Sequence, residues 1–266
     1  MSNRLSDDVR AECQALDAFL AAHLAEFGRR TVFYDWTVAD QVMHLHQVDL
    51  FGLLSMRDPD GFVEEVARIR AVQARGIELS QLMRESFGHL DAAALLETWR
   101  AAWQELCDLF DRGDPKTRMK WFGPEMSVRS FAAARQMEVW AHGQDIYDLL
   151  RVRRPATTQI RNICELGVRT FGWSFSNRGE PVPEALVRVS LAGPDGARWI
   201  WNPVGKEAVD GTAEDFALVV TQRRHVEDTA LHVTGASARR WMKIAQCFAG
   251  RPATGPAPGV RRVRYG

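Results

Sequence analysis

The chain has 266 residues, of which 34 are Lys or Arg and 34 are Asp or Glu, so its formal net charge at pH 7 is zero. A balanced charge gives no overall field that attracts a phosphate backbone or an anionic membrane surface, so we expect neither nucleic acid nor membrane as a partner. We find no apolar leader and no run of about 18 apolar residues, which favours a cytoplasmic location. With 46% hydrophobic residues, this length predicts two domains of ordinary size.

Apolar residues recur at helical spacing through the first part of the chain, with short polar or Gly-containing breaks between the runs. Thr37 followed by Asp40 resembles a capping box in which Asp replaces the usual Glu or Gln, and it predicts that a helix begins there. Pro155 lies beyond the last run and favours a break. These patterns predict a helical bundle over residues 1–153, with a loop at 112–124 and helices at 6–27, 37–56, 61–87, 91–111 and 127–150.

The pattern changes after Pro155. A helix at 159–175 is followed by alternating Val187, Val189 and Leu191, which is typical of a strand with one buried face. The runs ARWIWNP and LHVTG also predict strands, GTAEDFALVVTQRR predicts a capped helix or a buried apolar segment, and ASARRWMKIAQCF predicts an amphipathic helix. We therefore expect a small mixed α/β domain over residues 154–266 and an α+β class for the whole chain.

The four cysteines are far apart in the sequence, and no CxxC pair indicates zinc or redox chemistry. We expect them to be reduced and buried. Chemistry is better indicated by Glu138 and His142, which are four residues apart in EVWAH and therefore project from one helical turn. Such a pair can share one divalent ion if another element adds a ligand, although it can also form no more than a hydrogen bond.

The second predicted helix offers His44 and His46, which are separated by about 200° around its axis. Only one of them can face the pair, and periodicity does not choose between them. Asp145 follows His142 by three residues on the same stripe, so it is a candidate to orient a ligand imidazole. Arg135, one turn before Glu138, could contact a cofactor or substrate, or it could neutralise Glu138 and Asp145.

The runs DWTVADQVMHL and EVWAHGQDIYD resemble the DinB-like metal-binding superfamily, and within it the actinobacterial mycothiol-dependent maleylpyruvate isomerases. The resemblance implies a metal site formed by His44, Glu138 and His142, most often with zinc, and so selects His44 over His46. The run MKWFGPEMSVRSFAAARQMEVWAHG is typical of a subgroup rather than of the isomerase proper. The region from Asp215 onward resembles a small sterol-carrier-like domain found after such bundles.

Three protein ligands leave an open position on zinc that can take water or a thiolate. With mycothiol as cosubstrate, as the resemblance implies, we expect an isomerase or S-transferase that acts on a small electrophile, possibly one bearing a carboxylate. Arg223 and Arg224 could bind that carboxylate, or they could be ordinary surface arginines. We expect a monomer or a homodimer.

Two other functions are compatible with the residues. In the first, the chain is a non-enzymatic binding protein for an apolar or acyl ligand, and the metal is structural. In the second, a metal-activated water hydrolyses the substrate with Asp145 as the base. A site open to a cleft favours catalysis, and a fourth protein ligand favours a structural role.

Overall fold

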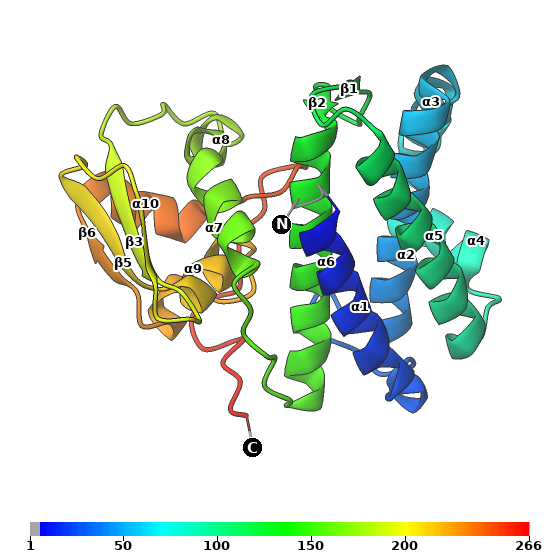
Figure 1. The fold of residues 1–266 in the computed structure, drawn as a ribbon, viewed down its shortest axis with the longest axis horizontal. Helices are drawn as coiled ribbons and strands as arrows, with labels where there is room; N and C mark the ends of the chain where they lie inside the picture. Colours follow the sequence, from blue (N-terminus) through cyan, green and yellow to red (C-terminus); the bar gives the residue numbers. More distant parts are fainter. Residues whose placement is uncertain (1–5, 266) are drawn as a thin grey trace. The chain divides into compact units, whose positions relative to one another are not determined.

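Two structural units divide the chain in the computed structural model, which describes residues 6–265 (Figure 1). The first unit, residues 1–149, is mainly helical, and the second, residues 150–266, combines a four-stranded sheet with helices. The α+β class predicted from the sequence is confirmed. None of the helices within residues 6–265 is both long enough and apolar enough to cross a membrane.

The first unit differs from the predicted helices at two places. The single helix expected at 61–87 is wrong, because the chain breaks near Gly76, which has a left-handed φ of 84°. The loop expected at 112–124 contains one strand of a short antiparallel hairpin. The elements are α1 (Asp7–Ala21), η1 (Leu24–Glu26), α2 (Val38–Arg57), α3 (Pro59–Gln73), α4 (Leu79–Phe87), α5 (Ala92–Arg112), β1 (Arg118–Met119), β2 (Met126–Ser127) and α6 (Val128–Leu150).

The start of α2 has the capping box that the sequence predicts. The Asp40 backbone N–H donates to Thr37 Oγ1 at 3.1 Å, and the Thr37 N–H donates to Asp40 Oδ2 at 2.9 Å. Arg84 of α4 also donates to Asp40, from Nε at 2.7 Å. Burial alone would raise the pKa of Asp40, but the hydrogen bonds from Arg84 and Thr37 hold it below its ordinary value. This ionised carboxylate therefore fixes the helix start and joins it to α4.

A buried ion pair joins α2, α5 and α6. Arg135 Nε donates to Asp49 Oδ1 at 2.9 Å, and Trp99 Nε1 donates to Asp49 Oδ2 at 3.0 Å. Arg135 Nη2 donates to the Leu45 carbonyl at 3.3 Å. Burial raises the pKa of Asp49, and the Arg135 charge opposes that rise. The pair holds α6 against the middle of α2, one turn from the helical segment that carries His44.

The second unit is built on a sheet with the order β4-β3-β5-β6, in which β3 and β5 are parallel and the other pairs are antiparallel. The alternation in β3 is confirmed, since Val187, Val189 and Leu191 are all buried. The helix expected at 159–175 is interrupted at Thr170, and β5 was not predicted. The elements are α7 (Ile160–Arg169), α8 (Phe171–Ser176), β3 (Val187–Ala192), β4 (Arg198–Trp201), β5 (Glu207–Thr212), α9 (Ala213–Val220), η2 (Val226–Asp228), β6 (His232–Thr234) and α10 (Ala236–Ile244).

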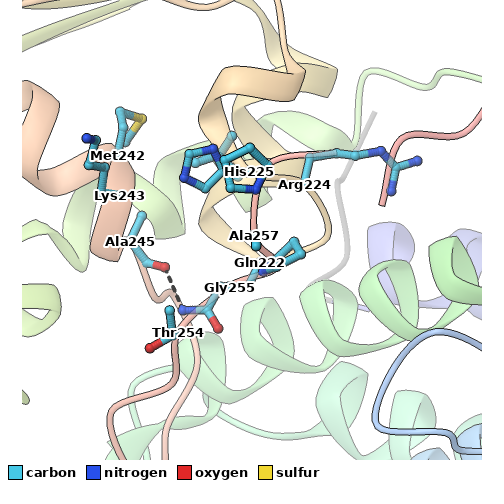
Figure 2. Close-up of a pocket in the computed structure, with 12 residues that line it drawn as sticks. Gln222, Arg224, His225, Met242, Lys243, Ala245, Thr254, Gly255 and Ala257 are labelled. Carbon is cyan, nitrogen blue, oxygen red and sulfur yellow. Dashed lines mark hydrogen bonds between the residues drawn. The ribbon is translucent and has the colours of Figure 1, made fainter. Parts of the chain in front are cut away.

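A cavity of about 250 Å³ lies within the second unit (Figure 2). Arg224, His225 and Lys243 line it together with apolar residues such as Val219 and Met242. In Figure 2 the Arg224 side chain extends away from His225 and Met242. Ligand pockets are commonly about 300 to 1,000 Å³, so this cavity suits a small ligand better than a long acyl chain.

The four cysteines, Cys13, Cys107, Cys164 and Cys247, are free and buried, as expected. Burial raises the pKa of the Cys107 thiol to about 12 and also raises that of the Cys164 thiol. These thiols are therefore packing groups and not nucleophiles.

We predict that Asp49→Ala lowers the free energy of unfolding by about 3 to 5 kcal/mol, because it leaves the Arg135 guanidinium buried without its counter-ion. Urea denaturation followed by circular dichroism measures the change. Asp17→Ala is the matched control, since it breaks the more exposed Asp17–Arg100 pair, and its cost should be about 0 to 1 kcal/mol. Equal losses in the two variants would contradict the role assigned to the buried pair.

Candidate metal centre

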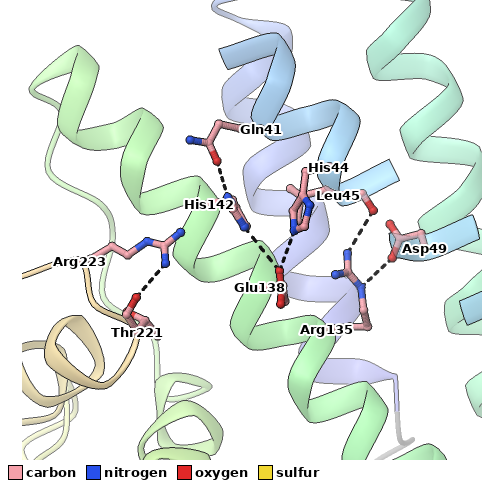
Figure 3. Close-up of polar contacts among 9 residues, drawn as sticks. All are labelled: Gln41, His44, Leu45, Asp49, Arg135, Glu138, His142, Thr221 and Arg223. Carbon is pink, nitrogen blue, oxygen red and sulfur yellow. Dashed lines mark hydrogen bonds and ion pairs between the residues drawn. The ribbon is translucent and has the colours of Figure 1, made fainter. Parts of the chain in front are cut away.

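Three side chains from two helices converge within the bundle: His44 from α2, and Glu138 and His142 from α6 (Figure 3). Glu138 Oε2 lies 3.0 Å from His44 Nε2 and 3.5 Å from His142 Nε2. One ligand atom from each residue lies within 4.8 Å of the other two. Ligand atoms about 2.1 Å from a tetrahedral zinc ion are about 3.4 Å apart, so these three atoms fit around a single ion with little movement.

The spacing of α6 explains half of this arrangement, because residues four apart lie above one another on a helix. The choice between the histidines of α2 depends on tertiary packing. His44 faces Glu138, whereas His46 is buried on another side of the helix, with its ring 4.8 Å from that of Phe87. Burial lowers the pKa of His46 to about 4, so this imidazole is neutral and belongs to the core.

Glu138 supplies the negative charge of the site. Burial alone would raise its pKa, but the hydrogen bonds and positive charges of His142 and His44 hold the pKa well below its ordinary range. The carboxylate is therefore ionised at neutral pH. Two imidazoles and one carboxylate are a donor set that suits zinc and leaves one position open in a tetrahedral site.

An aromatic loop lies against both imidazoles. The Trp36 ring centroid is 5.5 Å from that of His44 and 6.1 Å from that of His142, and the Phe33 ring meets His142 edge-on at 5.2 Å. Tyr34 and Asp35, between them, have positive φ values of 50° and 56°. Apolar rings beside the ligands exclude water and strengthen the electrostatic interactions of the site.

Gln41 is a site residue that the sequence analysis did not single out. Its side chain is fully buried, its Oε1 contacts His142 Nδ1, and its Nε2 donates to Thr31 Oγ1 at 3.0 Å. A signal for it existed, since Gln41 precedes His44 by three residues and therefore lies on the same face of α2. The partner that gives Gln41 its role lies 101 residues away in the sequence and could not be read from α2 alone.

Arg135 and Asp145 both lie on α6 and are almost completely buried. Arg135 contacts Asp49 and the Leu45 carbonyl, so its role here is structural, but the carboxylate that it pairs with is Asp49 rather than the expected Glu138 or Asp145 (Figure 3). A contact of Arg135 with a cofactor and a catalytic role for Asp145 stay predictions.

Arg223 and Arg224 belong to the second unit, just after α9, and both are buried rather than exposed. Arg223 Nη1 donates to the Thr221 carbonyl at 2.8 Å, as Figure 3 shows, and Arg224 Nη2 donates to Tyr265 Oη at 3.3 Å. These contacts disfavour the alternative of ordinary surface arginines. Their binding of a substrate carboxylate stays a prediction.

A family model described as the mycothiol maleylpyruvate isomerase N-terminal domain matches residues 9–147. The chain belongs to this family. The resemblance found in DWTVADQVMHL and EVWAHGQDIYD is thereby confirmed. At the family level, membership supports a thiol-dependent isomerase, and it places the three converging side chains in the part of the chain that defines the family.

The similarity to individual proteins covers more of the chain than the family model does. Two uncharacterised proteins, from two strains of Mycobacterium tuberculosis, are each 38% identical to this family member over 251 residues, which cover 93% of this chain and 96% of the relative. The crystal structure of a mycothiol-dependent maleylpyruvate isomerase aligns with a TM-score of 0.49 at 16% identity, over 81% of this chain and 86% of that one. A mutant of that enzyme aligns with the same TM-score at 14% identity.

We predict that His142→Ala abolishes stoichiometric zinc binding, whereas His46→Ala retains about one zinc per chain, because His142, unlike His46, adjoins Glu138. Elemental analysis after dialysis against a weak chelator, on protein made without a histidine tag, measures both. Retention of zinc by both variants, or its loss from both while circular dichroism shows a folded chain, would contradict the ligand assignment.

Proposed function

We propose that this family member is a metal-dependent isomerase or S-transferase that uses the thiol mycothiol as cosubstrate and acts on a small electrophile, which in our proposal bears a carboxylate. The observation that carries the proposal is the convergence of His44, Glu138 and His142 in a domain of the mycothiol maleylpyruvate isomerase family. Zinc held by these residues would supply an open coordination position and lower the pKa of a bound thiol.

The chain's own residues favour a thiolate at this position. Glu138 contributes the single negative charge among the three ligand residues, because the imidazoles bind as neutral donors. The three side chains therefore balance only half the charge of a divalent ion, and they leave a net attraction for an anion. Trp36 and Phe33 keep water from one side of the imidazoles, which strengthens this attraction.

Arg223 and Arg224 are the groups that we assign to the substrate carboxylate. Backbone carbonyls hold both guanidinium groups in place, at 2.8 Å in each case, so little side-chain entropy remains to be lost on binding. A planar guanidinium binds a carboxylate through two parallel hydrogen bonds. Asp145 lies three residues after His142 and is completely buried. We assign it to orienting a ligand imidazole of the metal site.

The binding-protein alternative is less well supported. The cavity in the second unit is small for an acyl chain and has Arg224, His225 and Lys243 among its lining residues. Within residues 6–265, no fourth His, Cys, Asp or Glu joins the three converging residues, and this agrees with an open rather than a closed metal site.

We expect the zinc-loaded protein to convert maleylpyruvate or a related unsaturated acid only when mycothiol is present, and Glu138→Gln to abolish turnover. Arg223→Ala or Arg224→Ala should raise KM by about 10- to 100-fold, which corresponds to one lost charge-assisted hydrogen-bond pair. Steady-state kinetics over a panel of small carboxylates measures these effects.

Arg239→Ala is the matched control, because this arginine is exposed on α10, and its KM should equal that of the wild type. Turnover that needs no thiol would favour hydrolysis. The absence of turnover with every electrophile and thiol, despite bound zinc, would favour ligand binding without catalysis.

A further inference from the structure

The Gln41 amide is held in one orientation by a directed chain of hydrogen bonds. Thr31 Oγ1 donates its only proton to the Trp36 carbonyl at 2.9 Å, since a carbonyl can only accept. The Thr31 oxygen must therefore accept the hydrogen bond that joins it to Gln41, at 3.0 Å, and the amide must present its Nε2 to Thr31. The other end of the amide, Oε1, then faces His142 Nδ1.

This orientation decides which nitrogen of His142 carries a proton. An amide oxygen can only accept, so Nδ1 must be the donor and carry the hydrogen. An imidazole that binds a metal is neutral, and a proton on Nδ1 then leaves the lone pair on Nε2, which is the atom that lies 3.5 Å from Glu138 Oε2. Two acceptor atoms facing each other repel, and a cation between them removes that repulsion.

We infer that Gln41 is a positioning residue, which holds the metal-bound His142 as the Nδ1-protonated tautomer with the Nε2 lone pair directed at the metal, and which adds no negative charge to the site because an amide is neutral. The inference rests on the metal-dependent function proposed above and extends it to the choice of the exogenous ligand.

The loop before α2 keeps this chain of hydrogen bonds rigid. The Thr31 backbone N–H also donates to the Trp36 carbonyl, at 2.7 Å, and an antiparallel bridge joins Arg30 to Thr37. Thr31 and Gln41 are both buried, so water does not compete for their hydrogen bonds. The same loop carries Phe33 and Trp36, whose rings contact His142. One loop therefore sets both the positions of these aromatic rings and the tautomer of His142.

The neutral amide has a chemical consequence. Ligand histidines often donate instead to a carboxylate, which raises the basicity of the imidazole and adds a negative charge. With Gln41, the amide adds no charge through His142, and Glu138 is the one carboxylate among the three ligand residues, so a divalent ion and its ligands keep a net positive charge. A net positive site selects an anionic fourth ligand, such as a thiolate, over a neutral one.

Zinc affinity, measured by competition with a chelator, tests the positioning role. Gln41→Leu removes both hydrogen bonds of the amide and should weaken zinc binding by about 10- to 100-fold. Gln41→Glu keeps an acceptor for Nδ1–H and should restore affinity to within about threefold of the wild type or better. Gln144→Leu is the matched control, because it removes a buried amide of α6 that donates to Asp148, and its affinity should be unchanged.

The choice of anion is tested on cobalt-substituted protein with thiocyanate and imidazole as probes, followed by the visible spectrum. Gln41→Glu should weaken thiocyanate binding by at least about fivefold and leave imidazole binding within about twofold, because only the anion senses the added charge. Equal affinities for thiocyanate in the wild type and Gln41→Glu would overturn the charge argument, and unchanged zinc affinity in Gln41→Leu would overturn the positioning role.

Nitrogen-15 NMR of His142 in metal-free protein at pH 8.5 separates this inference from the proposed function. A proton on Nδ1 in the wild type, with loss of that preference in Gln41→Leu, supports the inference even if zinc does not bind. An Nδ1 without a proton in the wild type overturns it, whether or not Nε2 is protonated. Failure of the wild type to bind zinc would overturn the proposed function alone.

Discussion

The Glu138 carboxylate, held between the imidazoles of His44 and His142, is the group on which the rest of the site depends. Burial disfavours its charged form, and the two imidazoles reverse that preference. An ionised carboxylate between two imidazoles is also a ligand for a divalent ion, whose charge it offsets in part. The chemistry proposed for this family member follows from that arrangement.

Helix α2 contacts the other helices and the metal ligands through different faces. Asp40 fixes its start against Arg84, Asp49 holds its middle against Arg135, and Gln41 and His44 face the ligands of α6. Because the buried Asp49–Arg135 pair joins α2 to α6 beside the ligand face, the distance between these two helices is constrained before any ion binds. Preorganisation of this kind keeps ligand atoms near their required positions and reduces the free-energy cost of forming a metal site.

Local patterns in the sequence predicted the features that depend on spacing within one element. These include the Glu138 and His142 pair, the capping box at Thr37 and the alternation in β3. The features that could not be predicted depend on partners distant in the chain. Periodicity left His44 and His46 equivalent, and only the packing of α6 against α2 distinguishes them.

The errors have physical causes of the same kind. The helical pattern continues past Gly76, but the positive φ of that glycine ends α3 and turns the chain toward α4. Strand β5, with the sequence EAVDGT, has too few apolar residues to be recognised alone, and it is a strand because it pairs with β3 and β6. Gln41 was missed because the sequence of α2 does not show which side chain its amide contacts, and that partner, His142, lies on another helix.

X-ray absorption at the zinc edge of the reconstituted protein tests the central claim most directly. The account predicts a first shell of nitrogen and oxygen at about 2.0 to 2.2 Å, with two imidazoles and no sulfur when no thiol is present. A sulfur scatterer near about 2.3 Å appearing only after mycothiol is added would complete the agreement. Sulfur in the first shell without any thiol, or a shell with fewer than two imidazoles, would contradict the site formed by His44, Glu138 and His142.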